Sequence, residues 1–280
     1  MCGFDHLEGH AYMHYVKFKR EKCSVCNLCR GVKNLTWDHV PPKGGIELTS
    51  VEMETILAVM TGNRENAKPR ESQNGVKYRT ICKECNEYLG HNFDLALNEF
   101  AHSVAMYLKT SIQLPKIVHH KTKPKRLIKA VLGHLVAAKA NVEDTRFDRL
   151  AREYVLDPSA ELPDDINIFY WVYPYTGSIT IRDFAMFVPR GIFAKPAMFQ
   201  TMKYFPIAYL ICSEGSYAGL NSLSMYRDCG LDDEVEIPIA LDRVEYAHWP
   251  EAPEGTTNVF AGGQSAMDAI VAQPRFSGKL

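Results

Sequence analysis

The sequence predicts an α+β protein in which a zinc-stapled strand–strand–helix module is followed by a helical connector and a mainly antiparallel α+β domain. Two Cys-x-x-Cys pairs, Cys26 to Cys29 and Cys82 to Cys85, predict the module. A helical period follows the second pair, and runs of β-forming residues follow residue 160. The length of 280 residues favours more than one domain. We expect a zinc-stapled domain at residues 1–110, a basic helical connector at 111–160 and an α+β domain with no assigned role at 161–280.

The two cysteine pairs offer four thiolates, which is the number that a tetrahedral structural zinc takes up. Such a site has no open coordination position, so we interpret the zinc as scaffold. A third cysteine, Cys23, precedes the first pair at the same spacing. We prefer Cys26 and Cys29 because Gly31 stands two residues after the second sulfur, where a zinc-knuckle turn favours a residue that tolerates positive φ. Cys23 is then a spare cysteine or a substitute ligand.

Two strands are predicted between the cysteine pairs. Residues 32–40 contain β-formers and deliver Asp38 and His39 at the end of the strand, where Pro41 and Pro42 stop it. Residues 76–81 have the same composition and run directly into Cys82.

Two helices are predicted in this part of the chain. Residues 49–52 form a capping box, and a short amphipathic helix follows and ends at Gly62. Residues 63–74 are polar and basic and predict a loop. After the second cysteine pair, apolar residues recur at helical spacing over about five turns: Leu89, Phe93, Leu97, Phe100, Val104 and Leu108.

The connector carries a basic run at residues 116–129 and a helix that begins at Pro124. A further helix is expected at residues 145–156, and residues 158–165 resemble a linker. The basic run is either a surface that follows nucleic-acid phosphates or a solvated connector. As candidate nucleic-acid contacts we take Lys43, Lys121, Lys123, Lys125 and Arg126.

The C-terminal part contains four β-rich runs at residues 166–174, 178–188, 204–212 and 234–241. Residues 175–178 predict a hairpin turn between the first two runs. No catalytic set is recognisable here, and its acidic character makes it unsuited to gripping DNA. We expect it to bind a protein partner, a nucleotide signal or a second copy of the chain.

The net charge of −1 conceals an asymmetry between the two parts of the chain. Residues 1–130 carry 20 Lys and Arg against 13 Asp and Glu, whereas the remainder carries 12 against 20. A positive field around a candidate metal site suits a polyanionic substrate and favours nucleic acid. The first residues lack the long apolar core of a signal peptide or membrane anchor, so we expect a cytoplasmic protein without membrane contact.

The order Cys26-x-x-Cys29, Asp38-His39-Val40-Pro41-Pro42 and Cys82-x-x-Cys85-Asn86 resembles the zinc-containing HNH endonucleases with the ββα-metal fold. It is most similar to the subgroup in which the second cysteine pair is followed by asparagine. The resemblance covers roughly residues 23–100. It implies a phosphodiester hydrolase acting on DNA, and more distantly a nuclease effector of bacterial or phage defence.

The resemblance also implies residue roles. His39 matches the general base that takes a proton from water. Asp38 matches a ligand of the catalytic divalent ion, and Asn86 matches a second ligand contributed by the helix. Their hard oxygen atoms favour Mg²⁺ or Mn²⁺. His91, five residues after Asn86, is a candidate auxiliary ligand.

Two features depart from the family pattern. The gap between the cysteine pairs is longer than in compact members, and Asn63, Asn66 and Asn74 are all candidates for the middle asparagine of the motif. Two other functions stay open. In the first, the zinc module is a nucleic-acid-binding or assembly element without catalysis. In the second, it is an adaptor for an activity carried by the C-terminal domain.

Overall fold

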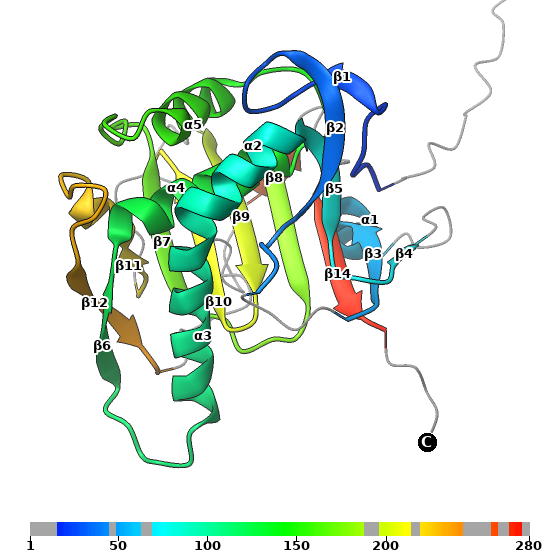
Figure 1. Ribbon diagram of the computed structural model, residues 1–280. Helices are drawn as coiled ribbons and strands as arrows, with labels where there is room; N and C mark the ends of the chain where they lie inside the picture. The colour runs from blue at the N-terminus through cyan, green and yellow to red at the C-terminus, as the bar shows by residue number, and fades with distance from the viewer. Residues whose placement is uncertain are drawn as a thin grey trace, which may run out of the picture.

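The computed structural model describes residues 16–44, 49–62, 69–187, 196–213, 219–242, 259–262 and 269–275. The fold is α+β, and every pairing between its named strands is antiparallel. Helices α2, α3 and α4 lie over one face of a large sheet, and a small sheet stands beside them (Figure 1). None of the helices in the described ranges is long and apolar enough to cross a membrane.

The small sheet has the strand order β1-β2-β5 and confirms the two strands predicted between the cysteine pairs. It consists of β1 (Cys23–Val25), β2 (Val32–His39) and β5 (Lys77–Cys82). Helix α2 (Lys83–Leu89) begins at the residue after Cys82, and a π-helical turn (Gly90–Asp94) joins it to α3 (Leu95–Lys109). The predicted apolar stripe is buried from Leu89 to Val104.

The helix predicted from residue 49 begins later than expected. Residues Val51–Thr55 form strand β3, in which buried and more exposed positions alternate as in a half-buried strand. Helix α1 (Ile56–Thr61) follows, and its N-cap is Thr55, whose hydroxyl accepts a hydrogen bond from the Ala58 N–H at 3.3 Å. The capping box assigned to residues 49–52 was wrong because pairing with other strands outweighs this local signal. The end of the helix at Gly62 is confirmed, with φ of 66°.

The large sheet joins strands from both ends of the chain in the order β11-β7-β10-β9-β8-β14-β3-β4, with β13 also paired to β8. The hairpin predicted at residues 175–178 does not form, because β9 and β10 lie between β7 and β8. Strand β9 was not predicted. The strands are β4 (Arg70–Ser72), β7 (Asn167–Val172), β8 (Ser178–Phe187), β9 (Pro196–Tyr204), β10 (Ile207–Cys212), β11 (Asn221–Ser222), β13 (Val259–Gly262) and β14 (Ile270–Pro274).

Within the segment predicted as a connector, most of residues 127–138 belong to the main hydrophobic core. Strand β6 (Ile117–Thr122) pairs with β12 (Val235–Ala240), and a 3₁₀ turn (Leu223–Tyr226) precedes β12. Helix α4 (Pro124–Ala137) starts at Pro124 as predicted, and all its residues except Arg126 are buried. Helix α5 (Arg146–Leu156) also forms as predicted, with a capping box between Thr145 and Asp148.

The C-terminus of α4 is held from two sides. The last four carbonyls of a helix have no partner within it, and burial requires that other groups satisfy them. The Asn27 amide donates to the carbonyls of Val136 at 2.9 Å and Lys139 at 2.8 Å, and the Thr80 hydroxyl donates to that of Ala137. From the large sheet, Arg182 donates to the Leu135 carbonyl. Both the loop that carries Cys26 and Cys29 and the large sheet therefore contact this helix end.

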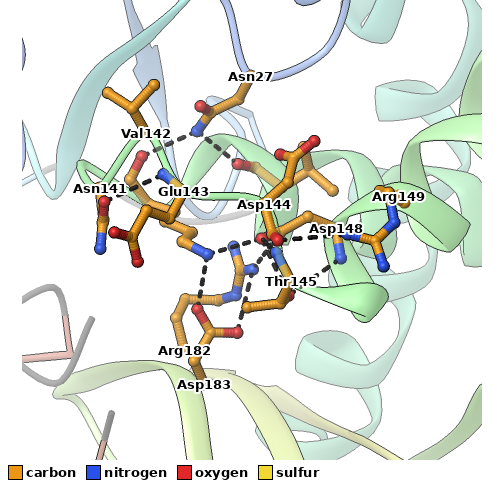
Figure 2. A network of polar contacts seen from close by, with 12 residues as sticks. Asn27, Asn141, Val142, Glu143, Asp144, Thr145, Asp148, Arg149, Arg182 and Asp183 are labelled. Atoms are coloured by element: carbon orange, nitrogen blue, oxygen red, sulfur yellow. Dashed lines mark hydrogen bonds and ion pairs between the residues drawn. The ribbon is translucent and has the colours of Figure 1, made fainter. Parts of the chain in front are cut away.

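A buried ionic network surrounds this contact (Figure 2). Lys139 Nζ lies 2.6 Å from Asp148 and 2.8 Å from Asp183, and Arg182 lies 2.5 Å from Asp148. Asp183 has a φ of 56° and lies at a bulge in β8. Its backbone N–H donates a hydrogen bond to Oε1 of Gln200 at 2.6 Å. Two cations and two carboxylates balance one another, which offsets much of the cost of burying them.

Candidate metal centre and catalytic site

The four predicted zinc ligands converge in space. The sulfur atoms of Cys26, Cys29, Cys82 and Cys85 all lie within 4.8 Å of one another. Zn–S bonds of about 2.3 Å in a tetrahedron require sulfur atoms about 3.8 Å apart, and the Cys29 and Cys82 sulfurs are separated by 3.9 Å. The four cysteines therefore form a cluster whose size and donor type fit one structural zinc ion.

Without a metal ion, the surroundings of this cluster favour the thiolate at Cys26, whereas burial raises the pKa of Cys82 to about 12. The hydrogen bond from the Cys85 thiol, aided by backbone N–H groups, lowers the pKa of Cys26 to about 4. One of these groups is the Cys82 N–H, 3.3 Å from the Cys26 sulfur. Conversely, the pKa of Cys85 is raised, mainly through its hydrogen bond to Cys26. A bound divalent cation would supply the positive charge that allows all four sulfurs to be thiolates.

Cys23 lies outside the cluster. It is exposed in β1, where it pairs with Asn34 of β2. The cluster contains Cys26 and Cys29 rather than Cys23.

Asp38 is buried and forms part of a triad that the sequence did not predict. Its carboxylate lies 3.1 Å from Nδ1 of His134, and Nε2 of His134 lies 2.8 Å from the Asp94 carboxylate. Burial opposes protonation of His134, but Asp94 and Asp38 outweigh it and raise the pKa to about 10. His134 is therefore an imidazolium held between two carboxylates, and it links the end of β2 to α4 and to the π-helical turn.

His39 follows Asp38 and points to the other side of β2. Its pKa is lowered, first by burial and then by the charges of Lys77 and Lys43. The ring forms a hydrogen bond with the backbone of Asn74. Its Nε2 atom is buried and has no hydrogen-bond partner among the described residues. The imidazole is thus neutral at pH 7 and retains a nitrogen that is not engaged by the protein.

Asn86 connects the start of α2 to β2. Its amide nitrogen lies 3.0 Å from the Trp37 carbonyl and 3.5 Å from the Thr36 hydroxyl, at a β-bulge in β2. Its side-chain oxygen has no hydrogen bond within the described part of the chain. The contact brings Asn86 to the strand that carries Asp38 and His39, through the backbone rather than through their side chains.

The remaining candidate residues lie apart from this contact. His91 is exposed on the π-helical turn, and Lys43 is exposed with its carbonyl accepting a hydrogen bond from Asn98 at 3.1 Å. In the basic run, Lys121 pairs with Glu234 at 2.6 Å, whereas Lys123 and Arg126 share Asp232 at 3.1 and 2.9 Å. Lys125 is buried. An acidic segment at residues 232–234 therefore neutralises much of this run.

His134 and Asp94 are the site residues that sequence reasoning missed. His134 lies inside the apolar pattern of α4, and Asp94 lies inside the stripe that continues into α3, so neither belongs to a local motif. Of the candidates for the middle asparagine, Asn74 lies next to His39, whereas Asn63 and Asn66 fall outside the described residues.

The chain was compared with family models, curated proteins and solved structures. None of them matches it.

Proposed function

We propose that this chain is a metal-dependent endonuclease of the zinc-stapled HNH type that hydrolyses phosphodiester bonds in DNA. The observation that carries the proposal is the neutral His39 imidazole at the end of β2, whose Nε2 has no hydrogen-bond partner among the described residues. The cysteine cluster brings the turn before β2 to the start of α2. A neutral imidazole is suited to take a proton from water near pH 7.

The groups around His39 favour a phosphate substrate. Lys77 lies opposite His39 in the β2–β5 pair, and both Lys77 and Lys43 act on its pKa as nearby positive charges. Cations in this position attract a phosphodiester and stabilise the charge that develops on its oxygens. His39 then activates the attacking water while Lys77 and Lys43 contribute positive potential at the phosphate.

Asp38 and Asn86 would hold a catalytic Mg²⁺ or Mn²⁺, which supplies charge neutralisation at the scissile phosphate and the leaving oxygen. Their donor atoms are one carboxylate and one amide oxygen, the hard ligands that these ions prefer. The Asn86 nitrogen is used by the Trp37 carbonyl, so its oxygen is the atom that remains for a ligand. His134 fixes the orientation of the Asp38 carboxylate through one of its two oxygens.

A plasmid-nicking assay with Mg²⁺ or Mn²⁺ tests the proposal. We expect the wild-type protein and a His102→Ala control, whose histidine is exposed on α3, to nick DNA, and the His39→Ala variant to lose activity by at least about 100-fold. Equal cleavage by His39→Ala and the wild type would remove His39 from the mechanism.

The alternative is a zinc-stapled nucleic-acid-binding or assembly module without catalysis. The observation in its favour is the engagement of Asp38 by His134 and of His134 by Asp94, since a fully paired triad is also a plain structural device. DNA binding without cleavage under any divalent ion, by a folded protein with one zinc per chain, would establish this alternative.

A further inference from the structure

A face of alternating cations and aromatic rings lies next to His39. Trp37 and His39 are two residues apart in β2, so their side chains project from the same face of the strand. Across the pair, Arg79 lies opposite Trp37 and Lys77 lies opposite His39. Asp38 and Tyr78 alternate with them and are buried, so the face that carries Trp37, Arg79, His39 and Lys77 points away from the core.

The rings on this face are already stacked. The Trp37 and Phe18 ring centroids are 6.0 Å apart with an interplanar angle of 30°. The Arg79 guanidinium carbon lies 5.3 Å from the Trp37 centroid, and that of Arg70 lies 6.0 Å from the Phe18 centroid. Arg79 is fixed in place because its Nε and Nη2 donate to the Arg20 carbonyl at 3.1 and 2.7 Å.

Trp37 keeps 42% of its surface exposed although it stands in this stack. A large aromatic ring exposed beside cations matches the surfaces that bind single strands, where bases stack on rings and cations follow the phosphates. The Lys77 ammonium has no ion-pair partner among the described residues, so its charge is available to such a ligand.

We propose that this face binds an unpaired nucleotide strand, with one base stacked on Trp37 and the adjoining phosphate beside Lys77 and His39. The inference rests on the proposed nuclease function and adds that the substrate strand is unpaired where it is bound, either in a single strand or at an opened position in a duplex. A base reaches an aromatic side chain only when it is out of the duplex stack. Trp37 and His39 are about 6.6 Å apart along the strand, so a base stacked on Trp37 brings its own phosphodiester toward the imidazole.

The test measures binding in a protein that does not cleave. Fluorescence anisotropy is recorded for a labelled single-stranded DNA of about 12 nucleotides, the RNA of the same sequence and the matching duplex, with the His39→Ala protein and without divalent ions. We expect both single strands to bind more tightly than the duplex. In this background Trp37→Leu, which keeps apolar volume but removes the ring, lowers single-strand affinity by about 5- to 150-fold.

Trp37→Phe restores most of that affinity, and Met225→Ala, at a side chain that is 79% exposed, leaves it unchanged. Zinc content and the thermal midpoint confirm that each variant is folded. Duplex binding as tight as single-strand binding, or parental affinity in folded Trp37→Leu, would overturn the inference. Single-strand binding that depends on Trp37 in a protein that never cleaves would support the inference and refute the nuclease. Cleavage that depends on His39 but not on Trp37 would support the nuclease and refute the inference.

Discussion

Replacing Asn27 by alanine should destabilise the protein strongly, although Asn27 is not a zinc ligand. The side chain is 5% exposed and donates to the carbonyls of Val136 and Lys139 at 2.9 and 2.8 Å. Its oxygen also accepts a hydrogen bond from Arg20. Each buried acceptor that loses its donor costs about 1–3 kcal/mol, so two acceptors cost about 2–6 kcal/mol. This is a large share of the roughly 5–15 kcal/mol by which a native protein is stable.

Urea unfolding measures the effect, and a chromogenic zinc chelator measures how fast the metal is released. Asn34→Ala is the matched control, because Asn34 is exposed in the same small sheet and its loss should change stability by no more than about 0.5 kcal/mol. Asn27→Asp should be no better than alanine, since it places carboxylate oxygen against two carbonyls. If Asn27→Ala unfolds within about 0.5 kcal/mol of the wild type, the helix end does not depend on this amide.

Three further perturbations follow from the same structure. Cys85→Ser should lose the zinc ion and on the order of 10 kcal/mol of metal-linked folding free energy. Cys23 is exposed and lies outside the cluster, so Cys23→Ser should keep one zinc per chain when the metal content is measured by mass spectrometry. Loss of zinc from Cys23→Ser would disprove the ligand set. Burial opposes ionisation of Asp148, but Arg182 and Lys139 outweigh it and hold its pKa below the ordinary value. The stabilisation from ionised Asp148 is therefore complete above the unfolded pKa of about 3.9 and is lost as the pH falls below it. The free energy of unfolding in urea should consequently fall less steeply with decreasing pH in Asp148→Asn than in the wild type. An unchanged pH dependence would contradict this role of Asp148. Gly133→Ala should destabilise the protein by about 1–3 kcal/mol, because a Cβ atom would lie 2.5 Å from Cδ2 of the buried Leu89. In a double-mutant cycle, the effects of Gly133→Ala and Leu89→Ala on the free energy of unfolding should be coupled. Additive effects would show that this contact is not the cause of the destabilisation.

Local signals predicted the elements whose cause is local. The cysteine spacing identified the four-cysteine cluster, the β-forming run identified β2, and Pro124 marked the start of α4. Such signals succeed because turn geometry, caps and apolar periodicity act over a few residues.

The failures arose where distant partners decide the structure. Residues 49–52 carry a capping signal, but residues 51–55 become β3 because β14 and β4 pair with them. The turn signal at residues 175–178 does not reveal that β9 and β10 will lie between the two flanking strands. His134 reads as a polar interruption in an apolar helix until Asp38 and Asp94 are brought to it from two other elements. Tertiary context overrides local propensity in each case.

The place of β3 in the large sheet has a consequence for synthesis on the ribosome. Thr55 pairs with Ile270 and Val51 with Pro274, so β3 cannot complete its ladder until residues 270–274 have been translated. Contacts of such high sequence separation form late and slowly. The cysteine cluster can capture its metal early, since all four ligands lie before residue 86. In the nascent chain the four cysteines are thus available to a metal ion well before the large sheet, against which α4 is finally held, is complete.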